Sequence, residues 1–233
     1  MPFGRRAVVI GAGSFGTAVA VLLARGGLRT TLQTRSAAQA RRLQADRENL
    51  VYLPGVDFPR ELRVAHLDDG LARAEYVFLG VPSQGMDEVI GGLRGAGLGP
   101  RAALVSLAKG LVPPDGRAPT VLLRELFGEG RVACLGGPAH ANEMVHEGAG
   151  LVAASSNEEL AGALAQVFIR AGVVCEQSDD PVGVELAGAA KNAAALAAGA
   201  TERHGLNAAG AAAGTSSRRS GATRPRRARA RSR

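Results

Sequence analysis

Short apolar runs alternate with helical patterns along most of this 233-residue chain. Continuous apolar strands separated by helices are typical of a mostly parallel sheet covered on both faces, because each strand is then buried on both sides. The runs that predict strands are Ala7–Ile10, Leu28–Gln33, Tyr76–Val81, Ala102–Leu107, Val132–Leu135, Leu151–Ala154 and Gly172–Cys175. We therefore expect an α/β fold, with helices on both faces of the sheet.

Residues 36–60 are the least regular part of the chain, and Pro54, Gly55 and Pro59 predict a loop there. The length allows one large domain, or one domain and part of another. The chain has no run of 18 apolar residues and no N-terminal stretch like a signal peptide, so we expect a cytoplasmic protein without a membrane span.

The residues that often bind metals do not form a metal-site pattern. Cys134 and Cys175 lie in apolar runs without metal-ligand spacing, which predicts buried thiols that act as small hydrophobic side chains. His140 and His146 lack the spacing and the acidic partners of a zinc site. We expect no metal site.

The sharpest local motif is GAGSFG at residues 11–16, which follows a predicted strand and opens a predicted helix. In such a turn Gly11 permits a tight bend, Gly13 lets the backbone approach a pyrophosphate, and Gly16 lets the helix pack closely on the strand. The free N–H groups and the dipole of the helix then favour an anion. The motif predicts a Rossmann-like dinucleotide-binding domain. The alternative is a glycine-rich turn that only packs.

The end of the second predicted strand bears on which dinucleotide binds. Sites that prefer NAD usually place Asp or Glu there against the ribose 2′-hydroxyl, but this chain has Gln33, Thr34 and Arg35. Arg35 is suited to a 2′-phosphate, and the hydroxyls of Thr34 and Ser36 are further candidates for binding it. We expect NADPH as the cofactor, with NADH as the second choice. The alternative is a solvated loop arginine.

Lysine is rare in this chain, since only Lys109 and Lys191 are lysines among its 28 basic residues. Arginine stays protonated, whereas a desolvated lysine can transfer a proton, so both positions are candidate catalytic residues. The alternative is drift in a gene that favours arginine codons. Lys109 and Pro82 each follow a predicted strand, at the edge of the sheet where open α/β folds bind ligands.

Lys191 and Asn192 form a polar pair inside the small-residue helix predicted over Val184–Ala200. We expect this lysine to be buried, because burial lowers a lysine pKa and suits the group to proton transfer. The alternative is a surface lysine whose ammonium extends into solvent.

From about Ala7 to Gly214 the chain resembles the bacterial type of NAD(P)-dependent glycerol-3-phosphate dehydrogenase. The segments that carry the resemblance are GAGSFGTA, LGVPSQ, AKGL, GGPAHANE and GVELAGAAKN, in the family's order. The resemblance implies that NADPH contacts Ser14, Phe15, Arg35, Lys109 and Ala141, beside the glycines of the turn and Pro82.

The same resemblance implies a substrate site and a reaction. Lys109, Gly137 and Ala139 would contact the substrate, although Ala139 stands where many members have Ser or Thr, which leaves only backbone atoms for that contact. A hydride would pass from the nicotinamide to C2 of dihydroxyacetone phosphate, with Lys191 as proton donor and with Asn192 and Lys109 holding and polarising the substrate.

The implied product, sn-glycerol 3-phosphate, feeds phospholipid synthesis, and a homodimer is compatible with the resemblance. Two alternatives remain at this stage. One is a non-catalytic remnant that only binds NADPH. The other is a related Rossmann reductase that acts on another small hydroxy acid.

We expect three parts along the chain. Residues 1–182 would form the dinucleotide-binding domain, residues 183–213 the first helices of an all-helical substrate domain that is largely missing, and residues 214–233 a disordered arginine-rich tail. Residues 204–233 contain eight arginines and no acid, whereas residues 1–203 contain 20 basic and 21 acidic side chains, a net charge of −1. The positive charge of the chain therefore resides in the tail.

The tail has three interpretations: an arm that binds nucleic acid, a disordered linker, or the product of a frameshifted gene. Its arginines are not interleaved with aromatic residues, so we expect no nucleic-acid partner. If Ser216, Ser217 and Ser220 use TCN codons, a shift of one nucleotide turns each into a codon for Phe, Leu, Ile or Val at helical spacing. We favour a single-nucleotide deletion.

Overall fold

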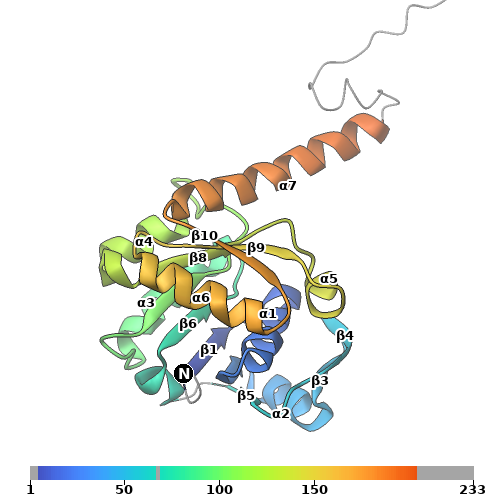
Figure 1. The fold of residues 1–233 in the computed structure, drawn as a ribbon, viewed down its shortest axis with the longest axis vertical. Coiled ribbons are helices and arrows are strands. Elements are labelled where there is room, and N and C mark those ends of the chain that lie inside the picture. Colours follow the sequence, from blue (N-terminus) through green and yellow to red (C-terminus); the bar gives the residue numbers. More distant parts are fainter. Residues whose placement is uncertain (1–4, 67–68, 204–233) are drawn as a thin grey trace, which may run out of the picture. The chain divides into compact units, whose positions relative to one another are not determined.

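An eight-stranded sheet forms the centre of the structure, a computed structural model that describes residues 5–66 and 69–203. Its strands are β1 (Arg6–Ile10), β2 (Arg29–Gln33), β5 (Leu62–Ala65), β6 (Tyr76–Leu79), β7 (Ala103–Ser106), β8 (Val132–Gly136), β9 (Gly150–Ala154) and β10 (Val174–Ser178). All neighbouring strands run parallel except β8 and β9. The predicted Rossmann-like, mostly parallel sheet is confirmed (Figure 1).

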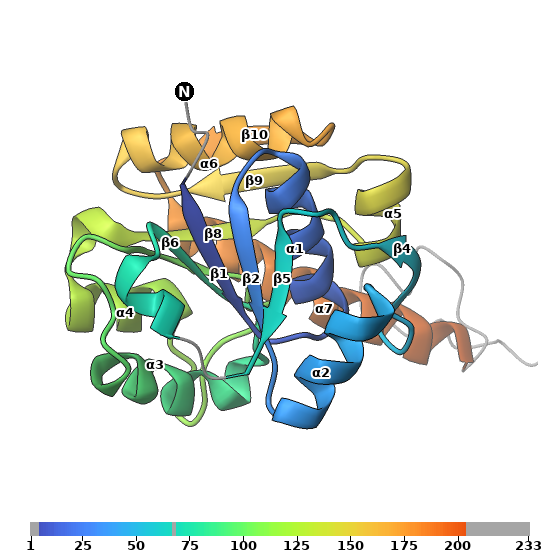
Figure 2. The same cartoon turned by 90° about the horizontal axis from the view of Figure 1, so that it is seen from below.

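Helices cover both faces of this sheet (Figure 2). The helices on one face are α1 (Ser14–Arg25), α5 (Ala141–His146) and α6 (Glu158–Arg170), and those on the other are α3 (Met86–Gly95) and α4 (Pro119–Phe127). The first face is filled by α1, which buries nearly every side chain, and by the fully buried Phe168 of α6. The second is filled by Met86, Ile90 and Leu123. Two separate cores therefore hold the sheet.

The strand order fixes where a ligand would bind. The order is β10-β9-β8-β7-β6-β1-β2-β5, so the chain builds outward from β1 in one direction and from β6 in the other. The loops after β1 and β6 leave the same edge toward opposite faces, and the crevice between them is the place where open α/β sheets bind ligands. This switch point lies beside the glycine-rich turn.

Residues 36–60 correct the sequence prediction of a loop. They form α2 (Ala37–Asp46) and a hairpin of β3 (Glu48–Asn49) and β4 (Leu53–Asp57). The helix was hidden by its polarity, because only Ala40 and Leu43 are buried on it. Arg47 ends α2 with a left-handed φ of 55°, and its guanidinium donates to the carbonyls of Phe58, Pro59 and Leu62. The hairpin therefore has its own anchor.

Both cysteines are buried free thiols, as the sequence predicts. Burial raises the pKa of Cys175 to about 11 and also raises that of Cys134, where the charge of Glu185 adds to the effect. The thiols therefore remain protonated at neutral pH and act as small apolar groups.

Helix α7 (Pro181–Arg203) is the last described element. The chain divides into two compact units, Met1–Ala190 and Lys191–Arg233. The predicted boundaries at residues 182 and 213 stay predictions, and the predicted arginine-rich tail lies outside the described residues. No helix in the described part is long and apolar enough to cross a membrane.

Candidate functional site

The glycine-rich turn connects β1 to α1 at the switch point. Gly11 has a φ of +112°, and a Cβ there would lie 2.5 Å from the carbonyl oxygen of Gly80. A Cβ on Gly16 would collide with the carbonyl oxygen of Gly11. Gly80 itself lies close to Gly16, with a virtual Cβ 3.2 Å from that Cα. The backbone segments therefore approach each other closely here, which explains why Gly11 and Gly16 are glycines. Gly80 takes part in the same contact, although the sequence did not single it out.

Gly13 differs from the other two glycines of the motif. A Cβ at Gly13 would meet nothing within 4 Å, and its φ of −77° suits any residue. Gly13 occupies the N-cap position of α1, where no side chain caps the helix. The open space beside uncapped N–H groups fits the phosphates of a dinucleotide, because a helix N-terminus attracts anions. The residues present therefore fit the predicted cofactor.

Lys109 contacts the glycine-rich turn and the loop after β8, two other segments in which the sequence predicts site residues. It follows β7, and its Nζ donates to the carbonyl oxygen of Ala139 at 3.1 Å. The same Nζ lies 4.1 Å from the ring centroid of Phe15 on the first turn of α1, a cation–π contact. The structure thus brings together Phe15, Lys109 and Ala139. The Phe15 ring and the Ala139 carbonyl thus hold the positive charge of Lys109 at the edge of the sheet.

The loop after β8 contains the predicted substrate residues. Gly137 has a φ of +131°, and a Cβ there would lie 2.5 Å from the carbonyl oxygen of Gly150, so packing against β9 alone accounts for this glycine. Ala139 is buried, and it offers its carbonyl to Lys109. Ala141 begins α5 and packs against the core. Roles for these three residues toward substrate or cofactor stay predictions.

Arg35 is exposed and lies two residues after the end of β2, on the same edge of the sheet as Gly11. Its two neighbours have hydroxyls that serve the local backbone: Thr34 donates to the carbonyl of Ser36, and Ser36 Oγ accepts from the N–H of Gln39. Because Thr34 has a single O–H, it has no donor left for a phosphate. Of the two hydroxyls, only Ser36 keeps its proton for that role.

Pro82 is exposed and leads into the single 3₁₀ turn η2 (Ser83–Gly85) after β6. Ser83 comes close to the turn that contains Lys109, since a Cβ on Gly110 would lie 3.3 Å from Ser83 Oγ. The turns that follow β6 and β7 therefore adjoin each other, as expected for carboxyl ends of neighbouring parallel strands.

Lys191 lies on α7 and is the first residue of the second compact unit, and its expected burial stays a prediction. The apolar surroundings that the sequence suggested are small side chains of the helix itself. Asn192 follows Lys191 on α7. Catalytic roles for both residues stay predictions.

The comparisons with known proteins decide the family. Residues 6–161 match the model of the family described as the N-terminus of NAD-dependent glycerol-3-phosphate dehydrogenase. This segment runs from the first residue of β1 into α6 and contains the glycine-rich turn and Lys109.

The chain belongs to the NAD-dependent glycerol-3-phosphate dehydrogenase family.

Several relatives carry that name. The glycerol-3-phosphate dehydrogenase [NAD(P)+] of Chlorobium luteolum is 43% identical over 69% of this chain and 49% of its own length. That of Thermus thermophilus is 40% identical over 70% of this chain and 50% of its own length. The chain thus spans about half the length of the curated relatives it matches. The crystal structure of glycerol-3-phosphate dehydrogenase from Coxiella burnetii aligns with a TM-score of 0.83 at 28% identity, over 91% of this chain and 65% of that one.

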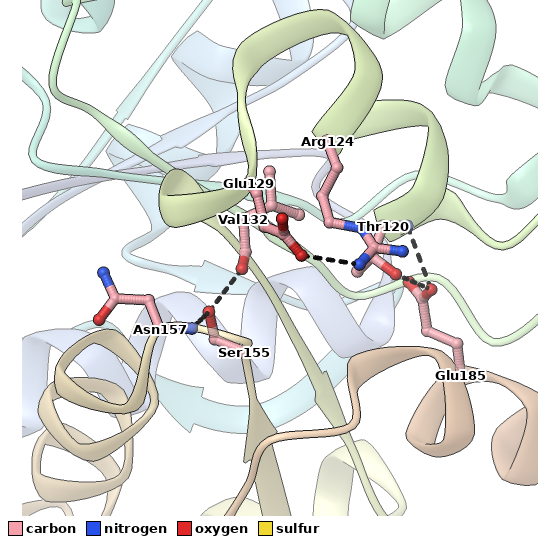
Figure 3. Close-up of polar contacts among 7 residues, drawn as sticks. All are labelled: Thr120, Arg124, Glu129, Val132, Ser155, Asn157 and Glu185. Carbon is pink, nitrogen blue, oxygen red and sulfur yellow. Dashed lines mark hydrogen bonds and ion pairs between the residues drawn. The ribbon is translucent and has the colours of Figure 1, made fainter.

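Glu185, near the start of α7, is a buried carboxylate that the sequence analysis did not single out. Its Oε2 accepts from the backbone N–H of Thr120 at 3.1 Å and from the hydroxyl of Thr120 at 2.6 Å (Figure 3). Thr120 lies in the first turn of α4, whose N-cap residue Ala118 makes no side-chain cap. A glutamate from 65 residues away therefore caps α4, where the helix dipole favours a negative charge.

The second oxygen of this carboxyl, Oε1, is buried and has no hydrogen-bond partner among the described residues. Burial raises the pKa of Glu185, and the hydrogen bonds from Thr120, the nearby Ser106 hydroxyl and the charge of Arg124 oppose that shift. The carboxyl therefore binds its proton more tightly in the folded protein than in the unfolded chain.

We expect Gly16→Ala and Gly13→Ala to affect stability very differently. The Gly16 methyl would press on backbone, which costs about 2 kcal/mol or more of unfolding free energy. The Gly13 methyl would enter open space and cost less than about 1 kcal/mol. Urea unfolding of both variants tests this. Equal losses would contradict the backbone contact at Gly16.

The stability of the chain relative to Glu185→Gln should fall as pH rises. A carboxyl with a raised folded pKa stabilises the folded state most when protonated, and this contribution is lost from about the ordinary value of 4.5 upward, through the folded pKa. Unfolding free energies of both proteins between pH 4.5 and 8 measure the difference. Glu143→Gln makes the same charge change at an exposed site and serves as control. If the unfolding free energy of the chain, relative to that of Glu185→Gln, rises with pH, the assignment is contradicted.

Proposed function

We propose that this chain binds a reduced nicotinamide dinucleotide at the carboxyl ends of β1, β6 and β7 and serves the reduction of dihydroxyacetone phosphate to sn-glycerol 3-phosphate. The observation that carries the proposal is the position of Lys109. Its ammonium lies on the Phe15 ring and bonds the Ala139 carbonyl, so one positive charge is fixed between the glycine-rich turn and the loop after β8. A phosphorylated ketone and a dinucleotide are both anions that such a charge stabilises.

The cofactor is held by backbone more than by side chains in this proposal. The N–H groups of Ser14 and Phe15 receive the diphosphate over Gly13, and Gly11 and Gly16 keep the turn tight enough for that approach. Pro82 and Ala141 border the same edge from β6 and α5. When bound, the dinucleotide supplies the hydride that reduces the ketone.

Reduction of a ketone also needs a proton at the developing alcohol oxygen. Lys191 donates it as general acid, and the neighbouring Asn192 holds the substrate by hydrogen bonds. Lys109 attracts the substrate phosphate and polarises the carbonyl. Backbone groups of Gly137 and Ala139 line the substrate pocket. The family to which the chain belongs and the presence of only these two lysines support these roles.

We propose NADPH over NADH as the cofactor. The exposed Arg35 guanidinium follows β2, and the residues at the end of that strand, Gln33 to Ser36, include no acidic side chain that could bind a ribose 2′-hydroxyl. A guanidinium binds phosphate by charge-assisted hydrogen bonds. The product is the glycerol backbone of phospholipids, which assigns the reaction to cytoplasmic glycerophospholipid synthesis.

Arg35→Ala should weaken NADPH binding roughly tenfold and leave NADH binding nearly unchanged, since only NADPH has the 2′-phosphate. Dinucleotide fluorescence titration of the full chain measures both dissociation constants. Arg41→Ala removes an exposed arginine of α2 and controls for net charge. Equal effects on both dinucleotides, or the same effect from Arg41→Ala, would contradict the role of Arg35.

The proposed reaction predicts NADPH oxidation by this chain in the presence of dihydroxyacetone phosphate, followed by absorbance. Lys191→Ala should lower kcat by about 10²-fold or more, because it removes the general acid, and should leave NADPH affinity unchanged. Dihydroxyacetone without phosphate should be a poor substrate. NADPH binding without turnover would contradict the reductase role of this chain, and efficient turnover of the unphosphorylated ketone would contradict the substrate.

A further inference from the structure

Asn49, in the hairpin of β3 and β4, is fully buried and contacts the glycine-rich turn. Its Nδ2 donates to the carbonyl oxygen of Ala12 at 3.1 Å and to the hydroxyl of Thr17 at 2.9 Å. These partners lie 37 and 32 residues away in the sequence. One amide group therefore connects the hairpin to the turn at two points, with both of its N–H bonds in use.

The two partners enclose the part of the turn that faces an anion. Ala12 precedes Gly13, the N-cap residue of α1, and Thr17 follows Gly16 in the first turn of that helix. Between them lie Ser14 and Phe15, whose N–H groups are free of the helix's own ladder because they are its first residues. A side chain that holds residues 12 and 17 together fixes the direction of these N–H groups.

The carbonyl oxygen of the Asn49 side chain, Oδ1, shows that placing an amide here destabilises the fold. Asn49 Oδ1 is buried and has no hydrogen-bond partner in the described part of the chain. An unpaired buried carbonyl destabilises a fold, and an apolar side chain in the same place would avoid it. What Asn49 supplies and an apolar residue does not is the pair of hydrogen bonds to the turn.

We propose that Asn49 is a positioning residue of the dinucleotide site, which sets the glycine-rich turn for the diphosphate and makes the hairpin of β3 and β4 part of that site. This role rests on the dinucleotide binding proposed above. Asn49 acts on the cofactor through the turn, without contact of its own. Loss of the amide lets the turn relax and weakens those dinucleotide contacts that involve the diphosphate.

Arg47, which lies between α2 and the hairpin, offers a matched control. Its guanidinium makes three hydrogen bonds, to the carbonyls of Phe58, Pro59 and Leu62, and none of these belongs to the glycine-rich turn. Arg47→Ala therefore loosens the hairpin and leaves the turn itself intact. Asn49→Ala loosens both.

The experiment compares the full chain with Asn49→Ala and Arg47→Ala, using three probes: NADPH, ADP-ribose and adenosine 2′-monophosphate, which lacks the diphosphate. Asn49→Ala should weaken NADPH and ADP-ribose roughly tenfold or more and leave adenosine 2′-monophosphate unchanged. Arg47→Ala should lower the unfolding midpoint in urea without changing any of the three dissociation constants. Thr17→Val removes one of the two contacts at nearly constant volume and should weaken NADPH about threefold, which keeps the test available if Asn49→Ala does not fold.

Three results would overturn the role of Asn49: unchanged NADPH affinity in Asn49→Ala and Thr17→Val, an equal loss of affinity in Arg47→Ala, or an equal loss for the probe without diphosphate. Failure of the unsubstituted chain to bind NADPH would instead overturn the proposed function, and this role with it.

Discussion

The contact of backbone with backbone among Gly11, Gly16 and Gly80 is the constraint on which the site depends. Gly11 and Gly16 exclude a side chain, because a Cβ there would press on the carbonyl of Gly80 or of Gly11, and a Cβ on Gly80 would lie tightly against Gly16. Their approach sets α1 directly against the ends of β1 and β6 and thereby fixes the position of its first turn. Phe15 is on that turn, so the same constraint puts its ring within reach of Lys109. Three glycines therefore determine where the positive charge of the site lies.

Most of the sheet could be predicted from the sequence, because central strands buried on both faces are written as continuous apolar runs. The elements that the sequence did not predict are those in which polar and apolar residues are mixed. β5 has the sequence LRVA, with an exposed Arg63, and is the last strand at one end of the sheet as the described residues form it. Helix α2 buries two side chains in ten residues, and the β3–β4 hairpin contains a proline and a glycine that are typical of loops. Local pattern is weak wherever tertiary contacts decide the conformation.

Within the site, a residue's role could be predicted when the evidence for it lies nearby in the sequence, and could not when its partners are far away. The roles of Gly11 and Gly16 could be predicted because the spacing of glycines in the turn is a local motif, although the carbonyl that excludes a side chain at Gly11 belongs to the distant Gly80. The contacts of Asn49 and Glu185 span 37 and 65 residues, and nothing near either residue shows that it caps a helix or supports a turn. The burial of Lys191 stays a prediction for a related reason. Apolar neighbours in its own helix favour burial, but they bury a side chain only when another element covers that face.

The first turn of α1 is held from two independent directions, and this has a consequence for ligand binding. Asn49 fixes residues 12 and 17 from the hairpin, and Lys109 lies on Phe15 from the end of β7. A loop that must order on binding loses conformational entropy at that moment and binds more weakly, whereas a loop ordered in advance does not. The cost of ordering this turn is met during folding, and the unpaired Oδ1 of Asn49 adds to that cost. The uncapped N–H groups of α1 are consequently aligned before any anion arrives, so the affinity for a diphosphate depends in part on Asn49, which does not touch it.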